Sequence, residues 1–441
     1  ADDMGLGKTL QVLTFLWSEF QESAPGENRR ALVITPASLV FNWMNEIERF
    51  APGLPATVVT GDVKARKALI KNAGEREVLI TSYDLLKRDL KAYQNLDFAV
   101  QIIDEAQYIK NHGTQVAKAV KEIRSEFRLA LTGTPVENRL SELWSIFDFL
   151  MPGFLYSYEK FRKEIELPAV QYSNSDAMER LQKMIRPFVL RRLKRDVLKD
   201  LPDKLEKDMF SPLESEQKEL YEAHTERLRL MLGMQSDAEF RTSKLQILAE
   251  ITRLRQICCY PGLVYEGYKG NSSKLEMCME LVQNAVNGGH KILLFSQFTT
   301  MLDVLAVRLK KAKVSFYMLT GATSKEKRAQ MVQAFNEDDT SVFCISLKAG
   351  GTGLNLTAAD IVIHYDPWWN LAVQNQATDR AHRIGQQNVV SVYRLFMKDT
   401  IEERIRALQE RKRELADEIL SGEGIGQALI SREEVLELLG R

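Results

Sequence analysis

Short apolar runs rich in Val and Ile alternate with helical patterns over the first part of the chain. These runs predict strands at residues 31–35, 56–60, 77–82, 99–104 and 128–132. A second series of such runs lies at residues 291–295, 315–320, 341–346, 360–365 and 389–396. Apolar strands that alternate with helices are typical of a parallel sheet covered by helices. The pattern therefore predicts an α/β protein with two lobes of this kind.

The region between the two series has a different pattern. At residues 137–289, Leu and Ile recur at helical spacing and β-branched runs are few, which predicts helical insertions. After residue 401 the pattern is that of a charged helix, then a Gly-rich spacer and a last helix that starts with a capping box. We therefore expect a first lobe at residues 1–150, helical insertions and a linker at 151–289, a second lobe at 290–420 and a tail helix at 421–441.

Composition and charge exclude several classes of protein. Of the 441 residues, 45% are hydrophobic and 27% are charged, which excludes an intrinsically disordered chain. The 60 Lys and Arg balance the 60 Asp and Glu, so a uniformly basic nucleic-acid binder is also excluded. No apolar run approaches the roughly 20 residues of a membrane helix, so we expect no membrane partner. The four Cys lack C-x-x-C spacing, which favours a reducing compartment.

The first residues are similar to the end of a phosphate-binding loop. Gly5-Leu6-Gly7-Lys8-Thr9 matches the last part of G-x-x-x-x-G-K-[ST]. In such a loop, backbone N–H groups at a helix N-terminus bind phosphates, the Lys neutralises their charge and the Thr holds magnesium. The first Gly of the motif is replaced by Asp2, and a Gly-rich start of an ordinary helix explains the match about equally well.

Two acidic residues follow the strand predicted at residues 99–104. Asp104 and Glu105 lie at its carboxyl end, where α/β folds bind ligands. Asp104 is placed to hold magnesium, and Glu105 to orient and deprotonate an attacking water. A lone Asp-Glu pair is more often a charge pair at the start of a helix. The phosphate loop upstream makes the catalytic interpretation the stronger one.

Two arginines in the second lobe are spaced to act together. Arg380 and Arg383 are three residues apart, which predicts that they share one face of a helix. Both could then reach a triphosphate bound by the first lobe and stabilise charge in the transition state. A surface helix with two arginines at this spacing remains the alternative.

Taken in order, these motifs give a resemblance that covers residues 1–420: the chain resembles the Swi/Snf-type ATPases of helicase superfamily two. The box at residues 104–107 ends in Gln107, whereas eukaryotic remodellers of this family usually have His there, which favours a bacterial or archaeal branch. Because the chain starts within the phosphate-loop motif, we expect a piece truncated there, without the first strand and with weak ATPase activity. The matching segments are residues 2–9, 34–40 with 42–43, 81–83, 104–107, 131–135, 291–298, 346–355 and 379–386.

The resemblance implies two RecA-like lobes and an enzyme that hydrolyses ATP, with magnesium, to move along double-stranded DNA. Family members shift or remove DNA-bound proteins without necessarily separating the strands. By motif matching, the catalytic residues are Lys8, Glu105, Arg380 and Arg383. The residues that contact ATP are Gly5, Gly7, Lys8, Thr9 and Gly353, and the magnesium ligands are Thr9 and Asp104.

Residues for DNA contact and for coupling follow from the same matching. Hydroxyls that follow predicted strands suit DNA phosphates, although any single one is more often a turn or N-cap residue. The candidates for DNA contact are Ser38, Thr81, Ser82, Ser296, Thr352 and Trp369. Residues Thr132, Gly133 and Thr134 are expected to couple nucleotide state to the arrangement of the lobes. Trp368 is interpreted as a packing residue.

The stretch at residues 186–195 has five basic residues and no acidic one. Its plain interpretation is a solvated face. The resemblance places it in the helical insertion of the family, where it would contact phosphates or brace the lobes.

Two other functions stay open. One is a helicase that separates strands of RNA or DNA with the same ATPase lobes, and the other is a scaffold with a vestigial ATPase, for instance one docked on RNA polymerase. For the translocase we expect a monomer in the cytoplasm of a prokaryote, associated with the nucleoid, with RNA polymerase or other DNA-bound proteins as candidate targets.

Overall fold

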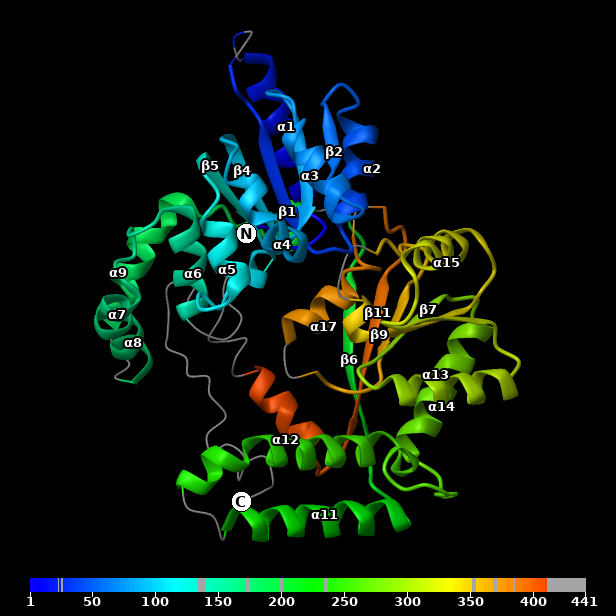
Figure 1. Cartoon of the computed structure of the whole chain (residues 1–441). Helices are drawn as coiled ribbons and strands as arrows, with labels where there is room; N and C mark the ends of the chain where they lie inside the picture. Colours follow the sequence, from blue (N-terminus) through cyan, green and yellow to red (C-terminus); the bar gives the residue numbers. More distant parts are fainter. Residues whose placement is uncertain are drawn as a thin grey trace. The chain divides into compact units, whose positions relative to one another are not determined.

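The structure of the chain is a computed structural model (Figure 1). It describes residues 1–22, 24, 27–133, 140–171, 175–198, 201–233, 237–350, 354–368, 371–383 and 385–410. Between residues 199 and 200 the chain divides into two compact units, called unit 1 and unit 2. No helix in these described ranges is long and apolar enough to cross a membrane.

Unit 1 contains a five-stranded sheet with the strand order β2-β3-β1-β4-β5. All neighbouring strands in it are parallel. The strands are β1 (Ala31–Thr35), β2 (Ala56–Val58), β3 (Val78–Ser82), β4 (Phe98–Asp104) and β5 (Ser125–Leu131), and the helices around them are α1 (Lys8–Glu22), α2 (Val40–Phe50), α3 (Val63–Lys71), α4 (Tyr83–Tyr93), η1 (Ala106–Ile109) and α5 (Gln115–Lys121).

Helices cover both faces of this sheet. Successive residues of β1 point to opposite faces, so Val33 packs into one core and Ile34 into the other. The first core includes Leu16 of α1 and Trp43 of α2. The second includes Leu86 of α4, together with residues of α3 and α5. Since both faces are covered, β1 is buried over its whole length, as its continuous apolar sequence predicts.

The other elements described in unit 1 are helices, and most of them share a separate core. Phe147, Phe161 and Leu181 are among the buried residues that hold these helices together. The elements are α6 (Leu140–Leu150), α7 (Tyr158–Phe161), the π-helix η2 (Arg162–Glu166), α8 (Leu167–Gln171), α9 (Ser175–Ile185), η3 (Arg186–Phe188) and α10 (Lys194–Val197).

Unit 2 contains a six-stranded parallel sheet with the order β6-β11-β10-β7-β9-β8. The predicted fold class, two parallel sheets covered by helices, is confirmed. The strands are β6 (Lys204–Ser211), β7 (Ile292–Ser296), β8 (Phe316–Leu319), β9 (Val342–Ser346), β10 (Ile361–His364) and β11 (Val390–Met397). The helices are α11 (Ser215–Gly233), α12 (Asp237–Cys259), η4 (Pro261–Leu263), α13 (Ser273–Asn287), α14 (Thr299–Lys311), α15 (Lys325–Glu337), α16 (Leu347–Gly350) and α17 (Leu371–Thr378), and residues 401–410 are also helical.

The strand β6 corrects the sequence analysis, which expected helix in this region. It pairs in parallel with β11 over its whole length, from Lys204 opposite Val390 to Ser211 opposite Met397. An edge strand has one neighbouring strand and one exposed side, so it tolerates charged residues. These charged residues interrupt the alternation of apolar and polar positions by which a strand is recognised in a sequence. Its acids pair with β11, as in the 2.6 Å contact between Asp208 and Arg394.

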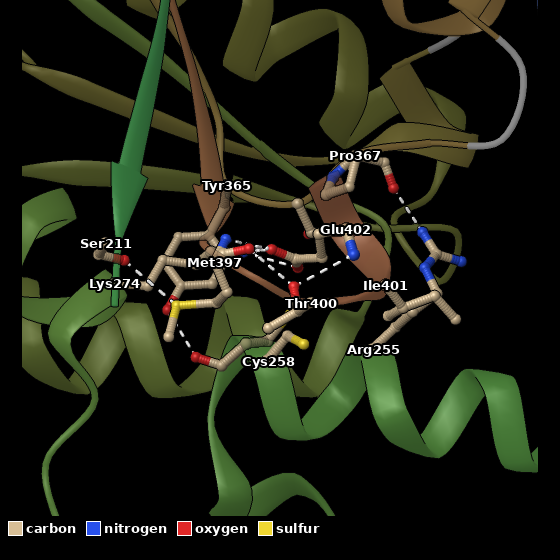
Figure 2. A network of polar contacts seen from close by, with 12 residues as sticks. Ser211, Arg255, Cys258, Lys274, Tyr365, Pro367, Met397, Thr400, Ile401 and Glu402 are labelled. Carbon is tan, nitrogen blue, oxygen red and sulfur yellow. Dashed lines mark hydrogen bonds and ion pairs between the residues drawn. The ribbon is translucent and has the colours of Figure 1, made fainter. Parts of the chain in front are cut away.

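A buried polar network ties several elements of unit 2 together (Figure 2). The Lys274 ammonium of α13 donates to both carboxylate oxygens of Glu402, at 2.7 and 2.5 Å. Both side chains are at most 1% exposed. The Glu402 carboxylate also accepts from the backbone N–H of Met397 at 2.8 Å, and the Tyr365 hydroxyl donates to the Cys259 carbonyl at 2.8 Å. The network therefore connects the ends of β10 and β11 with α12, α13 and the helix at residues 401–410.

Replacing Lys274 by Met is expected to destabilise unit 2 by about 3–5 kcal/mol, because it leaves the Glu402 carboxylate buried without a counter-charge. Denaturant unfolding of the purified protein measures this loss. The double variant with Glu402→Leu should recover most of the stability, since an apolar pair removes the uncompensated charge. Loss of the exposed Lys183–Glu179 pair through Lys183→Met should leave the stability nearly unchanged. A Lys274→Met protein as stable as that control would contradict the expectation.

Candidate active site

The phosphate-loop motif lies directly before α1 in unit 1. Gly5 and Gly7 have φ angles of 84° and 71°, which favour glycine. The backbone N–H of Gln11 donates to the Gly7 carbonyl at 3.0 Å, so the helix starts at the last glycine of the loop. Its first N–H groups and its dipole favour a bound anion there. Lys8 and Thr9 are in the first turn.

The Lys8 ammonium lies over the loop itself. It donates to the carbonyl oxygens of Asp2 and Asp3, at 2.7 and 3.2 Å. Burial lowers the pKa of Lys8, and the nearby Glu105 and Asp104 carboxylates oppose that shift. The structure thus brings Lys8 together with both acids at the end of β4, as the sequence analysis expected of these residues.

The Asp104 carboxylate is held in place by three donors. One oxygen accepts from the Trp43 indole N–H at 2.9 Å and from the Thr35 hydroxyl at 3.2 Å, and the other accepts from the Glu105 backbone N–H at 2.9 Å. Burial raises the pKa of Asp104, while the hydrogen bond from Trp43 opposes the rise. The sequence analysis gave Trp43 no role beyond its place in a motif, yet it fixes the orientation of this acid.

Asp104 and Thr9 offer the oxygen ligands that magnesium prefers. In the parts of the chain that the structure describes, no group of three or more His, Cys, Asp or Glu could hold a metal ion. One carboxylate and one hydroxyl fit an ion that takes its other ligands from water and from the phosphates of a nucleotide.

Glu105 has an unusual backbone conformation and a fixed side chain. Its φ of 53° lies in the left-handed region, where a residue other than glycine is strained. The Gln107 amide N–H donates to the Glu105 carboxylate at 2.7 Å, and the Gln107 amide oxygen accepts from the Thr132 hydroxyl at 3.2 Å. Gln107 therefore links the acid to the end of β5. The sequence analysis used Gln107 only as a sign of lineage and missed this contact.

Gly133 brings the end of β5 close to the phosphate loop. A Cβ atom at this position would lie 2.7 Å from the Met4 side chain, so a larger residue would have to displace Met4. Of the residues expected to couple, Thr132 thus contacts the acid box and Gly133 the loop. Thr134 lies outside the described residues.

Arg380 and Arg383 lie in unit 2, and the expectation that they share a helical face is wrong. Helix α17 ends at Thr378, and both arginines follow in turns. The Gln386 amide group explains this, because it donates to the carbonyls of residues 357, 359 and 381, at 3.1, 2.8 and 3.0 Å, and folds the chain back. Gly385, at φ 102°, allows that turn. Arg380 is 7% exposed.

The end of α17 is anchored by a buried histidine that the sequence analysis left without a role. His364 of β10 lies 2.8 Å from the Thr378 hydroxyl. Burial, followed by the charge of Arg394, lowers the pKa of His364 to about 3, so the ring is neutral at physiological pH. It acts there as a fixed polar contact.

The candidate DNA-contact residues are found in different environments. Ser38 is exposed. Thr81 is buried, and the Ser82 hydroxyl caps α4 by accepting from the Leu85 N–H at 3.3 Å. The buried Ser296 hydroxyl donates to the Asp366 carboxylate at 2.5 Å. Trp368 packs against the core of unit 2, as predicted. Thr352, Gly353 and Trp369 lie outside the described residues.

Comparison with known proteins gives the same family as the motifs. Residues 1–263 match the SNF2-related domain, and residues 273–385 match the helicase conserved C-terminal domain. The chain is 40% identical over 440 residues to an uncharacterized ATP-dependent helicase of Mycoplasma pneumoniae, covering 99% of this chain and 42% of that protein. It is 40% identical over 441 residues to a putative ATP-dependent helicase/translocase of Bacillus subtilis, and the match covers 96% of this chain and 46% of that protein.

A solved structure is also similar in sequence. The Sulfolobus solfataricus SWI2/SNF2 ATPase core in complex with dsDNA is 37% identical to this chain. The match covers 96% of this chain and 88% of that chain, with a TM-score of 0.45. The chain spans less than half the length of the two bacterial relatives. With the SNF2-related model matching more than half of its residues, the chain belongs to the SNF2-related family.

Proposed function

We propose that this chain is the ATPase core of a double-stranded DNA translocase, which hydrolyses ATP to move along DNA and to displace or remodel DNA-bound proteins. One observation carries the proposal: unit 1 holds the Lys8 ammonium, the Asp104 and Glu105 carboxylates and the Gln107–Thr132 link in one place at the N-terminus of α1. That arrangement suits hydrolysis of a nucleoside triphosphate.

Each residue has a distinct role in this proposal. The backbone N–H groups at Gly5 and Gly7 bind phosphate oxygens, and Lys8 leaves the loop carbonyls to neutralise phosphate charge. Thr9 and Asp104 hold magnesium, which neutralises charge on the phosphates when bound. Glu105, oriented by Gln107, accepts a proton from the attacking water.

Residues outside unit 1 complete the proposed cycle. Arg380 and Arg383 stabilise charge that develops on the transferred phosphoryl group, and Gly353 contacts the nucleotide. Thr132, Gly133 and Thr134 couple nucleotide state to the rest of the protein, since Thr132 reaches Glu105 through Gln107 and Gly133 packs on the loop.

The DNA is proposed to be held by its phosphates, so that binding does not depend on sequence. The proposed contact residues are Ser38, Thr81, Ser82, Ser296, Thr352 and Trp369. The Ser82 hydroxyl, which accepts from the Leu85 N–H, can still donate its own proton to a phosphate, whereas the Ser296 hydroxyl would first have to leave the Asp366 carboxylate.

The test is the ATPase rate of the full-length protein without nucleic acid and with duplex DNA, single-stranded DNA or RNA, each over a salt series. We expect strong stimulation by duplex, weakening as salt rises, because phosphate contacts release counterions. Stimulation mainly by single strands or RNA would favour the strand-separating helicase, which a fluorescent strand-displacement assay then detects. No ATPase activity under any condition would favour the scaffold.

The finer assignments are part of the same proposal. We place the protein in the bacterial or archaeal branch, in the prokaryotic cytoplasm on the nucleoid, as a monomer with RNA polymerase or other DNA-bound proteins as targets. The similarity to Mycoplasma and Bacillus proteins supports the prokaryotic assignment. The division into lobes at residues 1–150 and 290–420 and a tail helix at 421–441 is proposed with it, with insertions between the lobes that are helical apart from β6.

A further inference from the structure

An aspartate stands where a phosphate-binding loop usually has its first glycine, and its side chain has a specific partner. Asp2 is 2% exposed. Its carboxylate receives the Arg192 guanidinium, with Nη2 at 2.6 Å from one oxygen and Nε at 3.1 and 3.2 Å from the two. The Arg192 backbone N–H also donates to this carboxylate, at 3.0 Å. Burial would raise the pKa of Asp2, but hydrogen bonds from Arg192 and Gln11 outweigh burial and lower it.

The contact extends along the backbone on both sides. The Asp3 N–H donates to the Arg192 carbonyl at 3.0 Å, and the Lys194 N–H donates to the Asp3 carboxylate at 3.0 Å. Arg192 also donates to the Gln11 side-chain oxygen of α1 at 3.0 Å. Gln11 in turn donates to Asp2 at 3.2 Å and to the Leu6 carbonyl at 3.1 Å. The basic stretch thus contacts the start of the phosphate loop and the first turn of α1.

Two cations therefore hold the same two residues of the loop. Arg192 binds the Asp2 side chain, while Lys8 binds the Asp2 and Asp3 carbonyls. When Lys8 turns to a phosphate, those carbonyls lose their donor, and the contact with residues 192–194 is what still fixes the start of the loop. Arg192 comes shortly before the end of unit 1, so this contact joins the nucleotide site to the segment that continues into unit 2.

We propose that Arg192 is a positioning residue for nucleotide binding: it holds the phosphate loop in its binding conformation through Asp2, and bound nucleotide in turn holds the segment at residues 192–194. This inference rests on the proposed ATP site. The coupling is reciprocal, because a contact that favours nucleotide binding is itself favoured by the nucleotide.

The first experiment measures the affinity of the full-length protein for a fluorescent ATP analogue. Arg192→Gln and Asp2→Asn should each raise the Kd about 10-fold, and kcat at saturating ATP should change less than about 3-fold, because the contact acts on binding. The Kd of Arg192→Lys should lie between those of the wild type and of Arg192→Gln, since an ammonium keeps the charge but not the bidentate geometry of a guanidinium. The matched control is Lys183→Gln on α9, which removes a charge from an exposed pair and should leave the Kd unchanged.

The second experiment separates coupling from a merely structural role. Adding a non-hydrolysable ATP analogue should slow hydrogen exchange at the amides of Arg192 and Lys194, and this slowing should be lost in Asp2→Asn. The coupling is wrong if Arg192→Gln binds the analogue as tightly as the wild type does. It is also wrong if the analogue leaves hydrogen exchange at these amides unchanged. In both cases the proposed function stands. If the wild type binds no nucleotide, both fail.

Discussion

Replacing Arg383 by alanine is expected to lower the kcat of DNA-stimulated ATP hydrolysis by about 10³–10⁵-fold, the range found when an arginine that stabilises phosphoryl transfer is lost. Arg380→Ala should act in the same direction. Arg383 gives the cleaner test, because it is half-buried, whereas Arg380 is 7% exposed and its loss also removes packing. ATP affinity should change little, since the phosphate loop, Lys8 and Asp104 are all in unit 1.

Steady-state ATPase assays with saturating duplex DNA, beside nucleotide-binding titrations, measure the two effects separately. Arg308→Ala is the matched control, because Arg308 is an arginine of unit 2 that pairs with Glu276 at the surface. Its ATPase rate should equal that of the wild type. An Arg383→Ala protein that keeps normal kcat would remove this arginine from the catalytic set.

The second large effect is expected at Glu105. Glu105→Gln should lower kcat about 10²–10⁴-fold and leave ATP binding intact, because an amide of the same shape cannot accept the proton of the attacking water. The Gln107 amide N–H can still donate to the new side-chain oxygen, so the local geometry is kept. Lys8→Ala should instead weaken ATP binding, since the positive charge at the loop is lost.

Single-turnover hydrolysis and nucleotide titrations distinguish these two outcomes. Glu122→Gln is a matched control, as Glu122 is an exposed residue whose carboxylate accepts only a surface hydrogen bond from Gln94 among its described contacts. Hydrolysis by Glu105→Gln at the wild-type rate would assign the role of base to another group.

Much of the fold could be predicted because its central strands, such as β1, β3, β7 and β9, are buried on both faces. Such strands are continuous apolar runs, and every predicted strand has a counterpart in the sheets. The strand β6 was missed for the opposite reason, since an exposed edge carries charges that imitate a helical pattern. The turns at Arg380 and Arg383 were missed because a long-range contact, the Gln386 amide with backbone carbonyls, overrides local spacing.

The candidate site was predictable where local motifs set it and not where contacts between distant residues do. Lys8, Asp104 and Glu105 were chosen as candidates from strand ends and loop spacing. The Trp43–Asp104 hydrogen bond joins residues far apart in sequence, and the Arg192–Asp2 pair joins residues still further apart. Nothing in the spacing of Asp2 indicates its partner, so the departure from glycine was visible in the sequence but the contact with Arg192 was not.

The parallel pairing of β6 with β11 has a consequence for biosynthesis. Ser211 and Met397, at the ends of the paired strands, are 186 residues apart in the chain. At a synthesis rate of about 5–20 residues per second, β6 leaves the ribosome roughly 10–40 s before its partner exists. The charges at Lys204, Glu206 and Lys207, which conceal the strand in the sequence, keep this segment from pairing with other chains during that wait. The residues that make β6 hard to predict thus protect the nascent protein from aggregation.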